Sequence, residues 1–285
     1  MKFIVNGTFV SYVEKILAPK KYFQDYTSEI ITQSEFCEAM LADESLKGVA
    51  GFHDIPRIAK MPPNEIMPSE KIFGYLAKNN LISADDYNTM YDGLDEYRKT
   101  IYENYDHGEF ITYVYPEDER LLYAAAKIAK PKRLFMAGSY YGYLAVWAMQ
   151  AVRDIGGIAV FSDIDSEVCN LANANFDKLG FGDCAEICCE SASVLLANRT
   201  EPIDMLILDA TGRGDDPRPE YRGKRIYGAF LQEAKHLLRK GSVIYIHNME
   251  PEIPEMHPLV DGLREINARG ENYDTFNGLG VYIVN

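Results

Sequence analysis

The sequence predicts an α/β protein in which a helical N-terminal domain precedes a doubly wound, mostly parallel sheet. Three observations support this prediction. The first 110 residues show helical spacing of apolar residues and little strand signal. From about residue 117 short β-rich runs alternate with helical ones, as in right-handed βαβ units. Finally, Asn277 and Gly278 interrupt a β-rich run, which indicates a turn and a C-terminal antiparallel hairpin.

The N-terminal half of the pattern is helical. In "SADDYNTMYDGLDEYRKTIYENY", Ser83 is a candidate N-cap with Asp86 three residues later, and apolar side chains then recur every three or four residues up to Tyr105. This spacing predicts one amphipathic helix. Residues 27–42 and 69–79 are also expected to be helical, and the prolines of "MPPNEIMP" separate them. We expect a helical domain over 1–110 and an α/β domain over 111–285.

The second domain has a regular order of elements. Each strand is assigned to a short apolar or β-branched run and each helix to a segment of helical spacing. The expected helices are 117–129, 142–153, 166–179, 191–197, 226–238 and 257–268, and the expected strands are 133–137, 158–163, 184–189, 203–208 and 242–247, followed by the hairpin "YDTFNGLGVYIV".

Composition and charge narrow the classes of partner. The formal net charge is -14, which argues against binding to nucleic acid, because affinity for phosphate depends on clustered Lys and Arg. No apolar run approaches the roughly 20 residues that a membrane-spanning helix needs. The first 20 residues are not expected to be a secretory signal, since Asn6 and Glu14 interrupt their apolar stretch. The five cysteines form no C-x-x-C pair and are expected to be free thiols in a reducing cytoplasm.

Polar side chains gather where the strands are expected to end. In an open α/β sheet, ligands bind beyond the carboxyl ends of the strands. The first strand is followed by "GSYYG", whose glycines permit close backbone approach and entry into a helix. The second ends in Asp163, a carboxylate placed to accept both hydroxyls of a ribose. The fourth ends in Asp209, and the fifth in His247 and Asn248.

These segments carry a family resemblance over residues 117–285. The stretch "MAGSYYGYLAVWAM" resembles the cofactor loop E-L-G-x-Y-x-G-Y-S-A-V of catechol O-methyltransferase and its relatives among the class I S-adenosylmethionine-dependent methyltransferases. The similarity continues through "DIDSEVCNLANANFDKLGF", "IDMLILD" and "LLRKGSVIYIHN". The resemblance implies a Rossmann-like fold, S-adenosylmethionine as cofactor and a small-molecule substrate.

The resemblance also implies roles for individual residues. Tyr140 is expected to pack over the methionine portion of the cofactor, where an aromatic face attracts the sulfonium. Asp163 is expected to bind the ribose, and Asp209, His247 and Asn248 to face the acceptor as catalytic residues. The expected cofactor-binding residues are Gly138, Ser139, Tyr140, Gly142, Asp163, Ala192, Ser193 and Asp209.

Departures from the family pattern leave the metal and the base open. The loop acid is Met136 here, the loop serine is Leu144, and the general-base lysine is replaced by Gly212. His247 stands where the family has a metal aspartate. A site with an imidazole ligand in place of a carboxylate is unfavourable for magnesium, but it can still bind zinc, iron or manganese. Alternatively the metal has been lost and His247 has become the base, since its ordinary pKa of about 6.5 suits that role.

The loop "ATGRGDDPRPEYRGKR" after the fourth expected strand also has two interpretations. It is either a solvated connection or a flap on the substrate side. As a flap, its arginines would hold a carboxylate or a phosphate. These arginines are Arg213, Arg218, Arg222 and Arg225.

Three functions are compatible with these residues. The first is methyl transfer to an oxygen or nitrogen nucleophile, with secondary metabolism as the expected setting. The second is transfer or cyclisation of the aminocarboxypropyl arm of S-adenosylmethionine, with methylthioadenosine as by-product, because a helical N-terminal domain also occurs in nicotianamine synthase-like proteins. The third is a non-catalytic protein that binds the cofactor. The oligomeric state stays open, a homodimer included.

Overall fold

The computed structural model describes residues 9–49 and 52–285. The helices are α1 (Phe9–Leu17), α2 (Lys21–Thr27), α3 (Gln33–Ala42), α4 (Ile55–Ile58), α5 (Ile66–Lys78), α6 (Ala84–Thr89), α7 (Leu94–Asn104), α8 (Pro116–Ala129), α9 (Val146–Asp154), α10 (Ser166–Lys178), α11 (Ala192–Asn198), α12 (Ile226–Ala234) and α13 (His257–Glu265). The 3₁₀ turns are η1 (Glu44–Leu46), η2 (Pro219–Tyr221) and η3 (Pro254–Met256). The strands are β1 (Arg133–Ala137), β2 (Ile158–Asp163), β3 (Ala185–Cys189), β4 (Ile203–Leu208), β5 (Leu238–His247), β6 (Ala268–Tyr273) and β7 (Leu279–Val284).

The strands form one seven-stranded sheet in the order β3-β2-β1-β4-β5-β7-β6. The first five strands along the chain pair in parallel, and β7 pairs antiparallel with both β5 and β6. The expected doubly wound, mostly parallel sheet with a C-terminal antiparallel hairpin is therefore confirmed. The parallel arrangement places the carboxyl ends of β1, β2, β4 and β5 at one edge.

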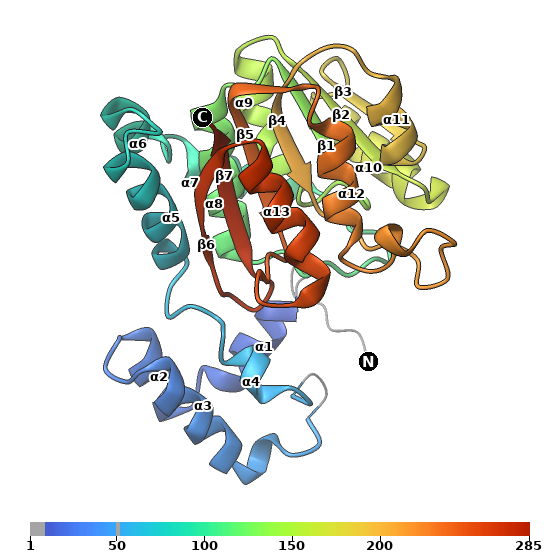
Figure 1. The fold of residues 1–285 in the computed structure, drawn as a ribbon. Helices are drawn as coiled ribbons and strands as arrows, with labels where there is room; N and C mark the ends of the chain where they lie inside the picture. The colour runs from blue at the N-terminus through green and yellow to red at the C-terminus, as the bar shows by residue number, and fades with distance from the viewer. Residues whose placement is uncertain (1–8, 50–51) are drawn as a thin grey trace.

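Both faces of the sheet are covered by helices (Figure 1). The strands feed alternate side chains into two cores, as their pleat requires. In β1, Leu134 and Met136 belong to the core under α5 and α7 to α10, while Phe135 and Ala137 belong to the core under α11 to α13. Burial on both faces explains why the central strands read as continuous apolar runs.

The N-terminal helices divide differently from the expected boundary at residue 110. Helices α1 to α4 enclose a separate small core that includes Phe36, Met40 and Ile58. Figure 1 shows them as a group apart from the sheet, joined to α5 by an extended segment. Helices α5 and α7, in contrast, share a core with the sheet, and α5 packs along β6. The change of core thus falls between residues 61 and 66, because the apolar faces of α5 and α7 are buried against the α/β layers.

The expected single helix over residues 83–105 is two helices. Ser83 caps α6 as predicted, by accepting a hydrogen bond from the N–H of Asp86. The chain then turns at Gly93, which has φ +85°, before α7 begins. Glycine adopts this left-handed conformation without steric cost, so the chain can turn between Thr89, where α6 ends, and Leu94, where α7 begins, although the apolar spacing continues through the turn.

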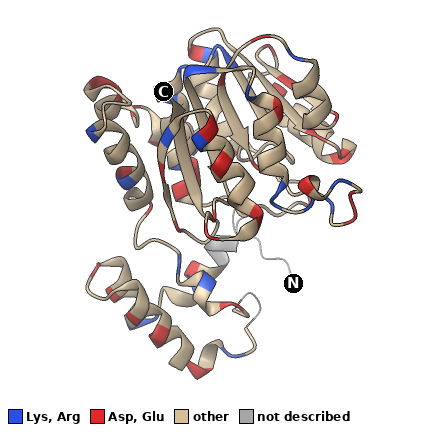
Figure 2. Ribbon diagram, in the orientation of Figure 1, with Lys and Arg blue, Asp and Glu red and all other residues tan. Residues whose placement is uncertain are grey.

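Charged residues of both signs are spread over the surface (Figure 2). Acidic and basic residues are interspersed on the helices, and the loop between β4 and α12 carries both. Within the described part of the chain, no helix combines the length and apolar character needed to cross a bilayer.

Candidate active site

The turn after β1 joins three strand ends. Gly138 has φ +83°, and a Cβ atom there would lie 2.1 Å from the carbonyl oxygen of Asp209. Only glycine permits this approach of β1 to the end of β4. Tyr140 has φ 50°, and its N–H donates to Oδ2 of Asp163 at 2.8 Å. The turn thereby ties the end of β1 to those of β2 and β4.

Asp163 organises the loop at the end of β2. Its Oδ1 accepts hydrogen bonds from the N–H groups of Ile164 at 2.8 Å and Asp165 at 3.1 Å. The side chain that caps α10 is Asp165, which accepts from the N–H of Glu167. Helix capping therefore does not account for Asp163, whose carboxylate instead fixes the loop beside the β1 turn.

A cavity of about 310 Å³, called cavity A here, lies over these strand ends. Five of the predicted cofactor-binding residues line it, while the loop after β4 contributes its other wall through Arg213, Asp216, Arg218 and Tyr221. The five are Gly138, Tyr140, Asp163, Ala192 and Asp209.

Three other predicted cofactor residues lie behind the cavity walls. Ser139 is buried, with its hydroxyl 3.5 Å from the carbonyl oxygen of Tyr140. Gly142 is packed beneath Tyr105, whose hydroxyl would lie 2.9 Å from a Cβ atom at that position. The hydroxyl of Ser193 donates to Glu233 at 2.5 Å. None of the three residues lines cavity A, so their direct contact with the cofactor stays a prediction.

A second cavity, of about 460 Å³ and called cavity B here, adjoins the first. Its floor is formed by Asp209, Lys224, His247 and Asn248. The opposite walls come from α4 and from the segments 111–114 and 276–277. Four residues line both cavities and form the wall between them: Tyr140, Asp209, Ala210 and Thr211. A ligand in cavity A and a ligand in cavity B would meet across this shared wall.

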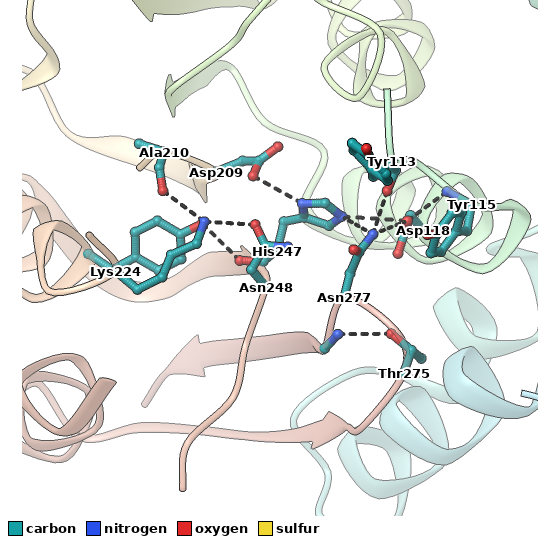
Figure 3. Close-up of polar contacts among 12 residues, drawn as sticks. Tyr113, Tyr115, Asp118, Asp209, Ala210, Lys224, His247, Asn248, Thr275 and Asn277 are labelled. Atoms are coloured by element: carbon teal, nitrogen blue, oxygen red, sulfur yellow. Dashed lines mark hydrogen bonds and ion pairs between the residues drawn. The ribbon is translucent and has the colours of Figure 1, made fainter. Parts of the chain in front are cut away.

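His247 is held between two carboxylates (Figure 3). Its Nδ1 lies 3.0 Å from Oδ1 of Asp209, and its Nε2 lies 3.5 Å from Oδ2 of Asp118. The residue is only 4% exposed and Asp118 is fully buried. Asp118 is itself fixed at the start of α8, where it accepts from the N–H of Tyr115 at 2.7 Å. The imidazole cannot turn away from either carboxylate without leaving a buried charge unpaired.

The side-chain amide of Asn277 lies beside both His247 and Asp118. Its Nδ2 donates to the carbonyl oxygen of Tyr113 and lies 3.3 Å from Oδ2 of Asp118 and 3.1 Å from Nε2 of His247. An amide nitrogen has two hydrogens, and these two oxygens can accept both. Nε2 of His247 is then left to donate toward Asp118.

These contacts contradict the interpretation of His247 as a general base. Burial lowers the pKa of His247, but the carboxylates of Asp209 and Asp118 outweigh it and raise this pKa to about 10. The same pairing lowers the pKa of Asp209, although burial opposes it. An imidazolium whose two nitrogens face protein groups has no free position to accept a proton from an acceptor. Its ordinary pKa suggested a base because the sequence did not show Asp118 beside it.

The charged imidazole predicts a loss of stability at alkaline pH. The pKa of His247 in the folded state is above its unfolded value of about 6.5. Its stabilising contribution is therefore complete below about pH 6.5 and is lost as the pH rises through about 10. We expect the free energy of unfolding, from urea titrations, to fall by up to about 1.4 kcal/mol per pH unit between pH 7 and 10. In His247→Gln this slope should be smaller, and equal slopes in the two proteins would contradict the charged state.

Lys224 is the second cation of the floor. Its Nζ donates to the carbonyl oxygen of Ala210 at 2.9 Å, to the hydroxyl of Tyr227 at 3.0 Å and to Oδ1 of Asn248 at 2.8 Å. Burial lowers the pKa of Lys224, with Asp209 opposing this effect. Sequence reasoning missed this residue, because it lies 15 positions after Asp209 in the charged loop rather than near the position where the family has its lysine.

The residues at the family's metal positions do not fit a divalent cation. Asp209 is paired with His247, whose second nitrogen faces Asp118, and the oxygen of Asn248 accepts from the Lys224 ammonium. A metal ion here would have to displace a lysine and compete with an imidazolium. Among residues 9–49 and 52–285, no three His, Cys, Asp or Glu side chains are grouped as metal ligands.

The charged loop after β4 lies on the side of cavity A. Arg213 is paired with Asp215 and Arg218 with Asp216, both within the loop. Arg218 also stacks on the ring of Tyr221 at 3.6 Å. Of the two interpretations of this loop, these contacts favour the solvated connection over the substrate-side flap. Arg222 and Arg225 line neither cavity, and the loop's own carboxylates pair with the two arginines that line cavity A.

Comparisons with known proteins give matches among solved structures only. No family model matches the chain, and no curated protein matches it. The matching structures include an O-methyltransferase from Bacillus cereus in complex with SAH, at 16% identity over 78% of this chain and 100% of that chain, with a TM-score of 0.48. They also include the O-methyltransferase TomG from Streptomyces achromogenes, at 16% identity over 78% and 98% of the chains (TM-score 0.48). A methyltransferase from Geobacter sulfurreducens matches at 19% identity over 67% and 89% (TM-score 0.49). Identities below 20% and TM-scores below 0.5 do not assign an activity to this chain.

Proposed function

We propose that the chain is an S-adenosylmethionine-dependent transferase that moves the methyl group to an oxygen or nitrogen atom of a small molecule. The observation that carries this proposal is the wall common to cavities A and B. A donor molecule in cavity A and an acceptor in cavity B face each other across Tyr140 and Asp209. Methyl transfer needs an in-line approach of the nucleophile to the methyl carbon, so positioning by two adjoining cavities supplies much of the acceleration.

Cavity A has the groups that an adenosyl moiety requires. Gly138 lets the backbone approach the ligand. Asp163 can accept a hydrogen bond from a ribose hydroxyl with the lone pair that the N–H groups of Tyr140, Ile164 and Asp165 leave free. Ala192 and the stacked pair of Arg218 and Tyr221 offer a flat surface for adenine. Ser139, Gly142 and Ser193 support this cavity from behind.

The amino-acid end of the cofactor would be held by groups other than those of the resembled family. Met136 and Leu144 are buried in the core beneath the sheet. Thr112 and Tyr113 line cavity B and can meet the amino-acid end of the cofactor there.

The floor of cavity B acts on the acceptor without a metal ion. Lys224 places a positive charge where the acceptor's oxygen or nitrogen would lie, and Asn248 positions that charge. This charge favours loss of the nucleophile's proton to solvent, and the methyl group then leaves the sulfonium sulfur for that atom and releases S-adenosylhomocysteine. His247 holds Asp209 in place rather than accepting a proton. Helix α4 covers cavity B and belongs to the group of helices α1 to α4, called the N-terminal unit here, so we assign to this unit the closing of the acceptor site.

Product analysis tests this function. The protein is incubated with S-adenosylmethionine and a panel of small phenols, amines and acids, and the sulfur-containing product is identified by mass spectrometry. S-adenosylhomocysteine is the expected product. Methylthioadenosine would instead establish aminocarboxypropyl chemistry, whereas cofactor binding by calorimetry without turnover would favour a non-catalytic protein.

Asp163→Ala should weaken cofactor binding. The change removes the carboxylate proposed to bind the ribose and releases the N–H of Tyr140. Hydrogen bonds to charged groups are typically strong enough that we expect a loss of about 10-fold to 100-fold in affinity for S-adenosylhomocysteine, measured by calorimetry. Asp165→Ala is the matched control from the same loop, because Asp165 only caps α10. Equal affinity in the wild type and Asp163→Ala would exclude the ribose role.

A further inference from the structure

Cavity B is lined by an arginine that has no acidic partner within residues 9–49 and 52–285. Arg57, on α4, lines this cavity, and its Nε donates to the carbonyl oxygen of Phe276 at 3.2 Å. Its guanidinium lies over the ring of Phe276, 4.8 Å from the centroid. Among the described residues it forms no ion pair with a carboxylate. Some exposed arginines of the chain pair with acids, as Arg213 does with Asp215 and Arg264 with Asp261, but of the arginines without such a pair Arg57 is the one that lines cavity B.

The carboxylates of cavity B are already engaged. Asp54 caps α4 by accepting from the N–H of Arg57 at 3.3 Å, and Asp209 is paired with His247. Burial lowers the pKa of Lys224, the carboxylates of Asp209 and Glu250 oppose this effect, and the charge of Arg57 lowers the pKa as well. Cavity B is thus lined by two cationic side chains, Arg57 and Lys224, although the chain has a net charge of -14. Neither forms an ion pair with a described carboxylate.

The remaining walls favour a flat apolar body. Tyr113, Tyr140 and Phe276 supply aromatic rings, and Ile58, Ile111 and Val114 supply aliphatic surface. A cavity with apolar walls and few convergent polar groups typically orients a small ligand by those polar groups. In cavity B the polar groups lie at two places. The guanidinium of Arg57 lies on α4, and Lys224 and Asn248 lie near the ends of the strands.

We propose that the acceptor is a small aromatic carboxylic acid, held by its carboxylate at Arg57, with its nucleophilic hydroxyl or amine directed toward Lys224. The planar guanidinium retains two terminal nitrogens that can bind a carboxylate by two parallel hydrogen bonds. This inference rests on the proposed function, because it names the acceptor of that reaction. It makes Arg57 a specificity-determining residue contributed by the N-terminal unit.

Ligand binding measured by NMR tests the proposal without requiring turnover. The probes are 4-hydroxybenzoate, 4-hydroxybenzamide and 4-hydroxybenzylamine, which share a ring and differ in charge. Each is titrated against the full chain with and without S-adenosylhomocysteine. We expect the acid to bind at least about tenfold more tightly than the amide, since hydrogen bonds to charged groups are the stronger ones. Asp54 would instead attract the amine.

Variants connect that preference to Arg57. In Arg57→Gln the acid should lose its advantage over the amide, and Arg57→Lys should retain part of it. Arg264→Gln, a surface arginine of α13 that is 75% exposed, should leave the preference unchanged. Thermal unfolding of each variant checks that it is folded.

Each remaining outcome overturns the proposal. These outcomes are equal binding of acid and amide, tightest binding of the amine, no binding of the acid, and a preference for the acid that survives in Arg57→Gln. Failure of the proposed function would be recognised separately, as an absence of S-adenosylhomocysteine binding by calorimetry. The acid preference can still be measured in that case.

Discussion

Asp118→Ala should lower the free energy of unfolding by about 3–5 kcal/mol, the range typical for removing one partner of a buried ion pair. Asp118 is fully buried and faces Nε2 of His247 at 3.5 Å. The change would leave the imidazolium facing one carboxylate instead of two. It would also remove the acceptor for the N–H of Tyr115 at the start of α8. Urea unfolding followed by circular dichroism at pH 7 measures the loss.

A second variant distinguishes the loss of the Asp118 charge from the loss of its hydrogen bond to the N–H of Tyr115, and a surface variant serves as the control. Asp118→Asn keeps an oxygen for the N–H of Tyr115 but removes the charge, so we expect an intermediate loss of stability. Asp261→Ala removes an exposed carboxylate that pairs with Arg264 on α13, and it should cost less than about 1 kcal/mol. A loss below about 1 kcal/mol for Asp118→Ala itself would show that the carboxylate does not stabilise the imidazolium.

The central strands were predictable because of their burial. The expected and observed bounds of β1, β2 and β4 agree at both ends. Each of these strands is covered on both faces, so its apolar run ends where the chain reaches the polar edge of the sheet. Periodicity alone could not show the break at Gly93, because the apolar spacing of α6 and α7 continues across it.

The expected domain boundary at residue 110 does not coincide with the change of hydrophobic core. Helical spacing identified α5 and α7 as helices but carried no information about the layer against which their apolar faces pack. The structure buries Ile72 and Phe73 of α5 in the same core as β1 and β7. The change from a helical to a mixed sequence pattern therefore placed the expected boundary at residue 110, whereas the hydrophobic core changes near residue 62.

The candidate site was predicted in its strand-end part. Asp163, Asp209, His247 and Asn248 follow strands, and the topology of a parallel sheet brings such residues to one edge. The partners that decide their chemistry come from other kinds of element. These partners are Asp118 from the start of a helix, Asn277 from the hairpin turn, Lys224 from a long loop and Arg57 from the N-terminal unit. No spacing in the sequence relates them to a strand end.

The role of His247 depended on such a partner. An isolated histidine at a strand end suggests a base, because its ordinary pKa lies near neutrality. The first turn of α8 carries three acids, which are also common as helix-stabilising residues near an N-terminus. Only the tertiary fold shows that the second of them, Asp118, faces the imidazole and keeps it charged.

Lys224→Met should abolish most of the transfer while leaving the cofactor bound. Methionine keeps the length of the side chain, but it removes the charge that we place beside the acceptor and the hydrogen bond to Asn248 at 2.8 Å. Loss of one preorganised electrostatic group in an active site typically costs about 100-fold to 1,000-fold in rate, and we expect a decrease of that size in kcat. Affinity for S-adenosylhomocysteine, measured by calorimetry, should change little, because Lys224 lines cavity B and not cavity A.

The matched control is Lys235→Met on the outer surface, where the ammonium pairs with Glu265 and where kcat should be unchanged. A chelator added to the wild type should also leave kcat unchanged. The oxygen of Asn248 already accepts from Lys224, and the carboxylates of Asp118 and Asp209 already face His247, so no group of oxygen ligands remains for a divalent cation. If a chelator stopped the wild-type reaction and magnesium restored it, the ammonium would not be the cation that acts at this site. Full activity of Lys224→Met would exclude Lys224 from the chemistry and leave Asp209 and Asn248 as the groups that face the acceptor.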